Sequence, residues 1–121
     1  MQFQSSEIQQ QMRKAEIKIH NITAGWLSQD DTGYHFEYDS EYLKQNNPEP
    51  VSLTLPIQKT KFTNKVLFPF FDGLIPEGWL LDIAERNWKL NTRDRMGLLL
   101  ACCKDCIGAV SVHPIIEEEN L

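Results

Sequence analysis

The stretch Phe-Phe-Asp-Gly-Leu-Ile-Pro-Glu-Gly-Trp at residues 70–79 joins two aromatics, two glycines and a proline to the start of a predicted helix. When this helix is continued over residues 77–88 at about 100° per residue, an apolar stripe forms on one side and Trp79 falls on the other. Its neighbours there are Asp82 and Arg86. Large aromatics at the water boundary are enriched at interface hot spots. The stretch therefore predicts a protein-binding surface and not a catalytic centre.

The residues before this stretch alternate between apolar and polar side chains, which is the period-two pattern of half-buried strands. The alternation starts at Ala15 and passes a candidate bulge at Gly25. Turn chemistry at residues 30–33 and a second alternating run over residues 34–38 follow it. Together these features predict a β-hairpin.

Beyond the hairpin, residues 40–45 predict a short helical turn and residues 51–55 predict a further strand that ends at Pro56. The lysine-bearing stretch between that proline and the aromatic junction has no regular pattern. Trp26, Trp88 and the phenylalanines at positions 68, 70 and 71 are assigned to the core, and Gly73, Pro76 and Gly78 are given structural roles.

After the helix at residues 77–88, a second helix is expected with Thr92 as its N-cap and Asp94 in its first turn. Residues 109–113 then alternate as a last strand before Pro114. The order is strands, helices, strand, without a repeated β-helix-β crossover. We therefore predict an α+β domain with a mostly antiparallel sheet and helices packed on one face.

Length and composition set further bounds. The 121 residues fit one domain, which we place at residues 15–116, with a flexible or weakly helical lead-in at residues 1–14 and an acidic tail at residues 117–121. The sequence has neither an apolar run long enough for a membrane span nor a secretory signal, so we expect a cytoplasmic protein. A net charge of −5 argues against direct, phosphate-driven binding of nucleic acid and favours a protein partner.

Residues that could carry chemistry are sparse. Cys102, Cys103 and Cys106, with His113 downstream, invite a zinc hypothesis, but their spacing lacks a second ligand pair and buried free thiols are preferred. His20 and His35 stand alone on strand-like segments, and no serine or cysteine has a recognisable base partner. We therefore expect neither a catalytic residue nor a bound metal or cofactor.

Several segments, taken in order, resemble the N-terminal subdomain of the HipA family of bacterial serine/threonine kinase toxins. The specific part is the Phe-Phe-x-x-Leu-x-Pro-Glu-Gly run at residues 70–78, followed by Asp-x-x-Gly-Ala at residues 105–109. Weaker matches are Ala-Gly-Trp-Leu at residues 24–27 and Val-Ser-Leu-Thr-Leu-Pro at residues 51–56. The resemblance runs from about residue 17 to residue 113, and it implies the fold of that subdomain.

The kinase machinery of the HipA family is missing from this sequence. It contains no Gly-rich phosphate loop, no catalytic-loop aspartate with a downstream asparagine and no Asp-Phe-Gly motif, so we do not expect it to be an enzyme. A separate module of this kind resembles the HipS antitoxins of tripartite HipBST toxin-antitoxin systems. That resemblance implies that the protein binds and inhibits a separate HipT-like serine/threonine kinase toxin, with a HipB-like DNA-binding protein completing the complex.

The resemblance also implies that Trp79 reaches into the kinase near its active site. Around it, the predicted partner-binding surface consists of Glu77, Gly78, Asp82, Ile83 and Arg86. Two alternatives stay open at this point. One is a non-catalytic structural or activating subunit that completes a HipA-family kinase, and the other is a small metalloprotein or thiol enzyme built on the cysteines.

Overall fold

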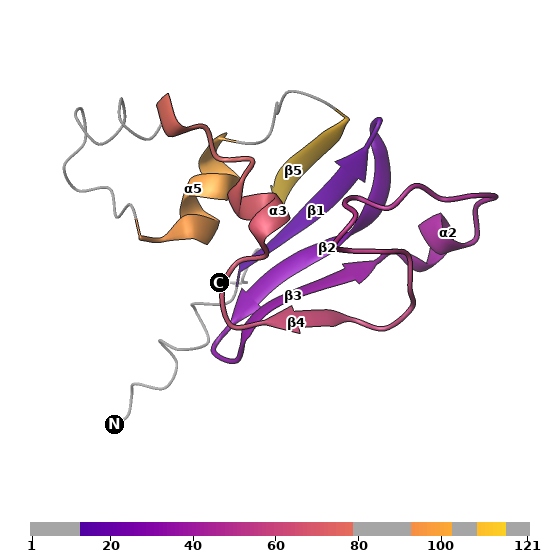
Figure 1. Ribbon diagram of the computed structural model, residues 1–121, viewed down its shortest axis with the longest axis horizontal. Helices are drawn as coiled ribbons and strands as arrows, with labels where there is room; N and C mark the ends of the chain where they lie inside the picture. Colours follow the sequence, from indigo (N-terminus) through magenta and orange to yellow (C-terminus); the bar gives the residue numbers. More distant parts are fainter. Residues whose placement is uncertain (1–12, 79–92, 103–108, 116–121) are drawn as a thin grey trace, which may run out of the picture.

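A computed structural model describes residues 13–78, 93–102 and 109–115. They form a five-stranded antiparallel sheet in the order β4-β3-β2-β1-β5, together with three short helices (Figure 1). The elements are β1 (Arg13–Ile19), β2 (Ile22–Asp30), β3 (Gly33–Tyr38), α2 (Ser40–Leu43), β4 (Phe62–Asn64), α3 (Pro69–Asp72), α5 (Arg95–Cys102) and β5 (Val110–Ile115). The predicted α+β class with a mostly antiparallel sheet is confirmed. Strand β1 begins two residues before the expected start of the domain.

Strands β1 and β2 pair through a two-residue turn in which His20 and Asn21 both have positive φ angles, the conformation of a tight hairpin turn. The register shifts at Ile17, so that Ala24 is an extra residue in β2 beside Gly25. The predicted bulge is thus confirmed. A Cβ added to Gly25 would lie 2.6 Å from the carbonyl oxygen of Glu37, so the close approach of β3 requires a glycine there.

The predicted hairpin between β2 and β3 is also confirmed. Its turn is closed by Asp30, whose Oδ1 accepts a hydrogen bond from the Thr32 N–H at 2.9 Å. Gly33 has a φ of +131°, and a Cβ there would meet the carbonyl oxygen of Asn64 at 2.5 Å. A side chain at Gly33 would therefore disturb both the turn and the pairing of the neighbouring strand.

The prediction of a strand at residues 51–55 is wrong. This segment is a turn in which the Leu55 N–H donates to the Ser52 carbonyl at 3.1 Å, with one isolated bridge between the same residues. The Val51 N–H donates to the hydroxyl of Tyr38 at 3.0 Å, so a side chain takes the place of a neighbouring strand. The fourth strand is β4, which lies in the lysine-bearing stretch expected to be irregular; its three residues are too few to show a period.

Two element boundaries differ from the prediction. Asp94 is the N-cap of α5, because its Oδ1 accepts from the Gly97 N–H at 3.1 Å and its carbonyl from Leu98; the expected cap, Thr92, lies outside the described residues. Strand β5 continues through Pro114 to Ile115. Proline is tolerated there because β5 is at the edge of the described sheet and the missing N–H leaves no ladder bond unmade. Of the predicted helix at residues 77–88, only Glu77 and Gly78 are described, and both have helical backbone.

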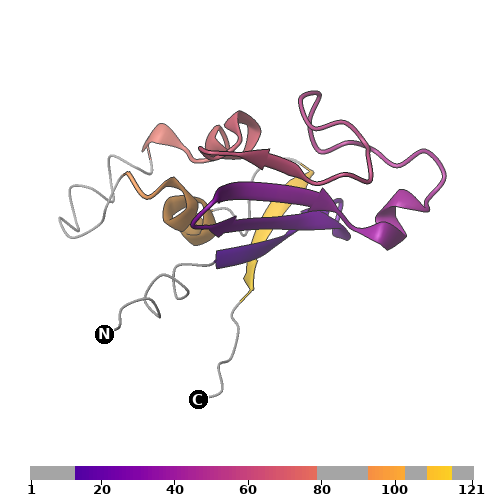
Figure 2. The ribbon, with the colours of Figure 1, turned by 90° about the horizontal axis from the view of Figure 1, so that it is seen from below.

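One hydrophobic cluster joins the sheet, α3 and α5. Figure 2 shows α3 lying over the strands. The buried side chains of the cluster belong to Ala15, Ile17, Ile19, Ala24, Leu27, Phe36, Tyr38, Tyr42, Val51, Leu55, Leu67, Phe68, Phe71, Ile75, Met96, Leu98, Leu99 and Val112. No helix in the described part of the chain is long and apolar enough to cross a bilayer.

The predicted core assignments hold in part. Phe68 and Phe71 are buried, and Phe70 is partly buried against the cluster. Trp26 is not in the core, because it alternates with the buried Gly25 and Leu27 and so lies on the other face of β2. There its indole N–H donates to Asp39 at 3.3 Å and the ammonium of Lys14 lies 5.6 Å from the ring centroid. The assignment of Trp88 falls outside the described residues.

Candidate partner-binding site

The aromatic junction predicted to carry the binding surface is built around α3. Pro69 occupies the first turn of this helix, where its missing N–H costs nothing and its fixed φ favours the helix. Gly73 ends the helix, and its N–H donates to the Pro69 carbonyl at 2.9 Å. Phe71 and Ile75 are buried and fix the segment on the sheet. The junction is therefore an ordered step in the chain and not a loose connection.

Beyond Ile75 the chain turns outward. Pro76, Glu77 and Gly78 are exposed, and a Cβ added to Gly78 would meet no described atom within 4 Å. Gly73 is the C-cap of α3 with a helical φ of −71°, so its backbone does not need the conformational freedom of glycine. The structural role predicted for Gly78 stays a prediction, because the residues that follow it lie outside the described part of the chain. Of the predicted site, Glu77 and Gly78 lie on the surface as a partner contact requires. Trp79, Asp82, Ile83 and Arg86 lie outside the described residues, so their grouping stays a prediction.

An ion pair between α3 and α5 holds the junction in place. Arg95 Nε lies 2.6 Å from Asp72 Oδ1, and this hydrogen bond raises the pKa of Arg95. Asp72 is the last residue of α3 and Arg95 the first of α5, so the pair joins the helical segments on the two sides of residues 79–92. The pair therefore ties the end of α3 to the start of α5, 23 positions further along the chain.

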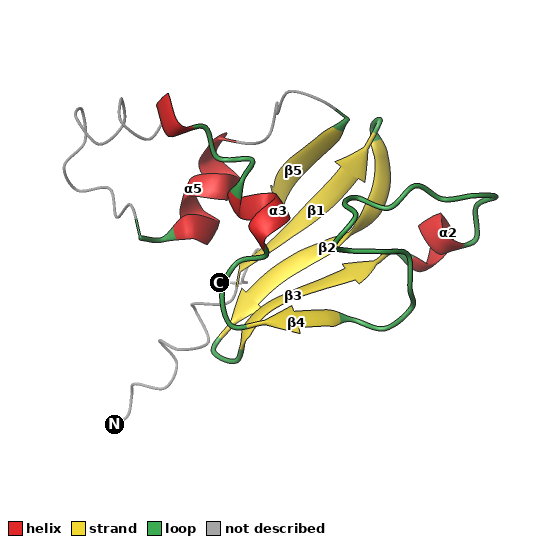
Figure 3. Cartoon of the chain, in the orientation of Figure 1, coloured by secondary structure: helices red, strands yellow, loops and turns green. Residues whose placement is uncertain are grey.

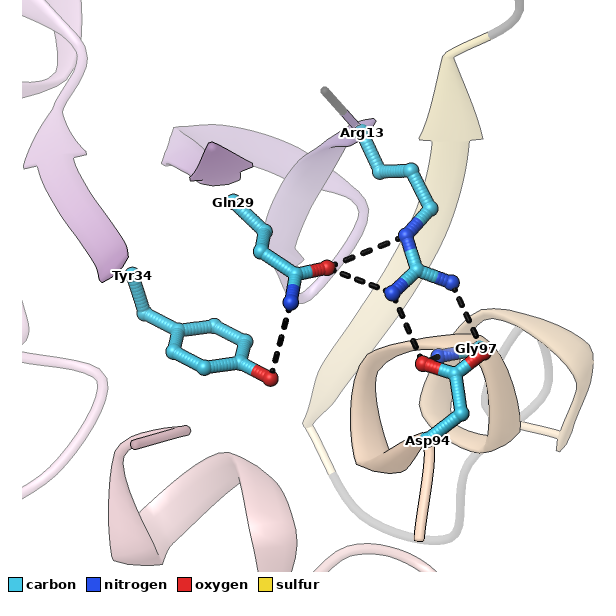
Figure 4. Close-up of polar contacts among 5 residues, drawn as sticks. All are labelled: Arg13, Gln29, Tyr34, Asp94 and Gly97. Atoms are coloured by element: carbon cyan, nitrogen blue, oxygen red, sulfur yellow. Dashed lines mark hydrogen bonds and ion pairs between the residues drawn. The ribbon is translucent and has the colours of Figure 1, made fainter. Parts of the chain in front are cut away.

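A polar network next to this pair ties α5 to the sheet (Figure 4). The Arg13 guanidinium donates to both carboxylate oxygens of Asp94, at 2.7 and 3.0 Å, and also to Gln29 Oε1 at 3.0 Å. Gln29 donates in turn to the hydroxyl of Tyr34 at 3.1 Å. The Arg13 hydrogen bonds lower the pKa of Asp94, and burial raises the pKa of Tyr34. Sequence reasoning missed this network, because Arg13 and Asp94 are 81 positions apart.

The prediction that His35 stands alone is wrong. Its Nε2 lies 3.1 Å from both Asp30 Oδ1 and Thr32 Oγ1, and its Nδ1 lies 3.0 Å from Thr63 Oγ1. Both ring nitrogens are thus engaged in joining the β2–β3 turn to β4. The period-two pattern puts His35 and Thr63 on one face only once β4 is known to be a strand, so their contact could not be predicted from the sequence.

The expectation that no serine has a base partner is also wrong, since Ser111 Oγ lies 2.8 Å from His113 Nε2 on β5. Glu16 is opposite His113 in the register of β1 and β5, but its carboxylate accepts a hydrogen bond from Thr23 on β2. Within residues 13–78, 93–102 and 109–115, no carboxylate is hydrogen-bonded to His113, which is the contact that would orient a catalytic histidine. Cys103, Cys106 and the side chain of Cys102 lie outside what the structure describes, so the zinc hypothesis stays untested there. Within the described residues, no group of three or more histidine, cysteine or acidic side chains is placed to hold a metal ion.

The described architecture defines the class of protein. It is a small α+β domain whose five-stranded antiparallel sheet carries an ordered junction that projects toward solvent at Glu77 and Gly78.

Comparison with known proteins gives the family. The family model for the HipA N-terminal domain matches residues 15–113, and the chain belongs to that family. A protein of Haemophilus influenzae (strain KW20 / Rd), described as uncharacterized, is 31% identical over 102 residues, which are 84% of this chain and 92% of that protein. A solved structure of the N-terminal domain of HipA toxin has a TM-score of 0.68 and 29% identity, and the match covers 89% of this chain and 95% of that one. The resemblance inferred from the sequence is confirmed.

Proposed function

We propose that this protein is an antitoxin that binds and inhibits a separate HipT-like serine/threonine kinase toxin in a tripartite toxin-antitoxin system in the cytoplasm. Membership of the HipA N-terminal domain family supports the toxin-antitoxin setting. The observation that carries the proposal is the projection of Glu77 and Gly78 from a junction anchored by Phe71, Ile75 and the Asp72–Arg95 pair. An anchored segment loses little conformational freedom when it binds, which favours tight association.

In this proposal Trp79, the next residue, is the main contact and enters the kinase near its active site. The surrounding contacts come from Glu77, Gly78, Asp82, Ile83 and Arg86. The role is non-catalytic, because the protein acts by occupying or distorting the active-site region of its partner. A HipB-like DNA-binding protein would complete the complex.

Substitution of Trp79 tests the proposed contact with the kinase directly. In a phosphorylation assay with a purified HipT-like kinase, the wild-type protein is expected to suppress phosphate transfer, and Trp79→Ala to lose at least about 2 kcal/mol of binding, or about thirtyfold in affinity. Trp79→Phe, which keeps an aromatic ring, should retain part of the affinity. Asp31→Ala is the control, because Asp31 is an exposed residue in the β2–β3 turn outside the proposed surface.

Whether the wild-type protein lowers or raises phosphate transfer by the kinase distinguishes an inhibitor from an activating subunit. Stimulation of phosphate transfer by the wild-type protein would replace the antitoxin with an activating subunit. Full inhibition by Trp79→Ala at the wild-type concentration would remove Trp79 from the mechanism. Circular dichroism of each variant shows that a loss of inhibition does not come from unfolding.

A further inference from the structure

A second surface, far from the junction, presents an apolar side chain to water. Leu53 lies in the turn of residues 52–55 and is 96% exposed. The turn closes without its side chain, through the Leu55 N–H and through a contact of 3.0 Å between the hydroxyls of Ser52 and Thr54. Leucine has no intrinsic advantage in a tight turn, where small polar residues and glycine are favoured. Its presence at this position is therefore not explained by the folding of this segment.

The fold holds the Leu53 turn firmly. The hydroxyl of the buried Tyr38 accepts a hydrogen bond from the Val51 N–H and donates one to the Leu55 carbonyl, so one core residue holds both sides of the turn. Tyr42 donates to the Glu49 carbonyl at 2.6 Å and fixes the chain a few residues earlier. The side chains of Val51 and Leu55 are themselves buried. Leu53 is thus an apolar side chain on a preorganised support, which reduces the entropy lost on binding.

The loop that carries the turn is basic, although the protein as a whole is acidic, and of its lysines Lys44 is paired with Glu41 at 3.3 Å. The segment from Lys44 to Lys65 contains four lysines and one acidic residue, Glu49, which gives it a charge of +3 in a chain of net charge −5. Lys59 and Lys61, which follow the turn, are exposed. Lysines beside the edge strand β4 also discourage pairing between sheets. An apolar contact within a charged rim is the usual anatomy of a protein interface.

We propose that the Leu53 turn is a second docking point for the kinase partner, in which Leu53 enters an apolar pocket rimmed by carboxylates that face Lys59 and Lys61. This inference rests on the proposed function. Figure 3 shows the long loop between α2 and β4 at the end of the sheet away from α3 and α5. Contacts at the junction alone would leave the domain free to pivot, whereas a second contact at the other end fixes its orientation on the kinase.

The test compares binding and inhibition for substitutions at one position. With the purified kinase, Leu53→Asp should weaken binding at least about tenfold in isothermal titration calorimetry, and Leu53→Met, which keeps an apolar side chain of similar volume, should restore most of the affinity. The melting temperature of Leu53→Asp should match the wild type, because the side chain is exposed. At saturating concentration Leu53→Asp should still inhibit the kinase fully, because Trp79 is unchanged in this variant.

The role of the two lysines is tested with a separate variant. The double variant Lys59→Glu, Lys61→Glu should bind more weakly, and its affinity should depend less steeply on salt than that of the wild type. Equal binding by Leu53→Asp and the wild type would overturn the second docking point and leave the antitoxin proposal standing. Failure of the wild-type protein to bind the kinase at all would overturn both.

Discussion

Asp94 combines two interactions that usually belong to different residues. Its carboxylate caps α5 by accepting a hydrogen bond from the Gly97 N–H. Its two oxygens also accept hydrogen bonds from the two terminal nitrogens of the Arg13 guanidinium. Bidentate pairs between arginine and a carboxylate are the stronger class of charge-assisted hydrogen bonds. A single carboxylate therefore fixes the start of α5 relative to β1, and with it one side of the junction.

Two substitutions separate these roles. Asp94→Asn keeps a good cap but loses the charge, and we expect it to cost about 1 kcal/mol; Asp94→Ala loses both and should cost about 2–3 kcal/mol. Urea unfolding measures both free energies. If both variants lost the same free energy of unfolding, the cap would contribute nothing to stability. If Asp94→Asn were as stable as the wild type, the ion pair with Arg13 would contribute nothing.

Among the elements, the β2–β3 hairpin is the clearest case of one that sequence predicts, because its alternation and its turn residues lie within a few positions of one another. The strand expected at residues 51–55 does not form, because strand pairing depends on a partner elsewhere in the chain as well as on the local pattern. An alternating run pairs only where a partner strand is available, and here the Tyr38 hydroxyl takes the Val51 N–H. The candidate site also shows that sequence patterns predict only local features. The aromatic junction is predicted from neighbouring residues, whereas the Arg13–Asp94 pair that supports it joins residues distant in the chain.

The turn of the same hairpin predicts a pH dependence. Hydrogen bonds from the Thr32 hydroxyl and N–H, and then from His35, lower the pKa of Asp30 to about 2. Since the folded pKa of Asp30 lies below the ordinary value of 3.8, its carboxylate contributes stability that is present above about pH 4 and is lost as the pH falls toward 2. The wild type should therefore be more stable than Asp30→Asn at pH 5, and the difference should vanish near pH 2.

Urea unfolding at several pH values between 5 and 2 measures this difference. Asp31→Asn controls for the loss of one negative charge from the same turn. A stability difference between the wild type and Asp30→Asn that stays constant over this range would show that the Asp30 carboxylate gains nothing from its hydrogen bonds in the folded protein.

On the scale of the whole molecule, one aromatic core connects the two proposed contact surfaces. Phe36 lies at its centre, with ring centroids 4.9 Å from Tyr38 and 5.6 Å from Phe71. Tyr38 holds the Leu53 turn and Phe71 fixes α3, so both surfaces depend on the same packed side chains although they lie at opposite ends of the sheet (Figure 1). We therefore expect the described domain to unfold as a unit.

A substitution at Phe71 tests this cooperativity. Phe71 is fully buried, so Phe71→Ala should lower the free energy of unfolding by about 3–5 kcal/mol, a large part of the stability of a small domain. Phe70→Ala is the matched control and should cost clearly less, because Phe70 is only partly buried. For both variants, near-ultraviolet and far-ultraviolet circular dichroism should report one coincident transition. If the aromatic signal of Phe71→Ala were lost well before the sheet signal, α3 and its junction would form a separate unit, and the two contact surfaces would not share a core.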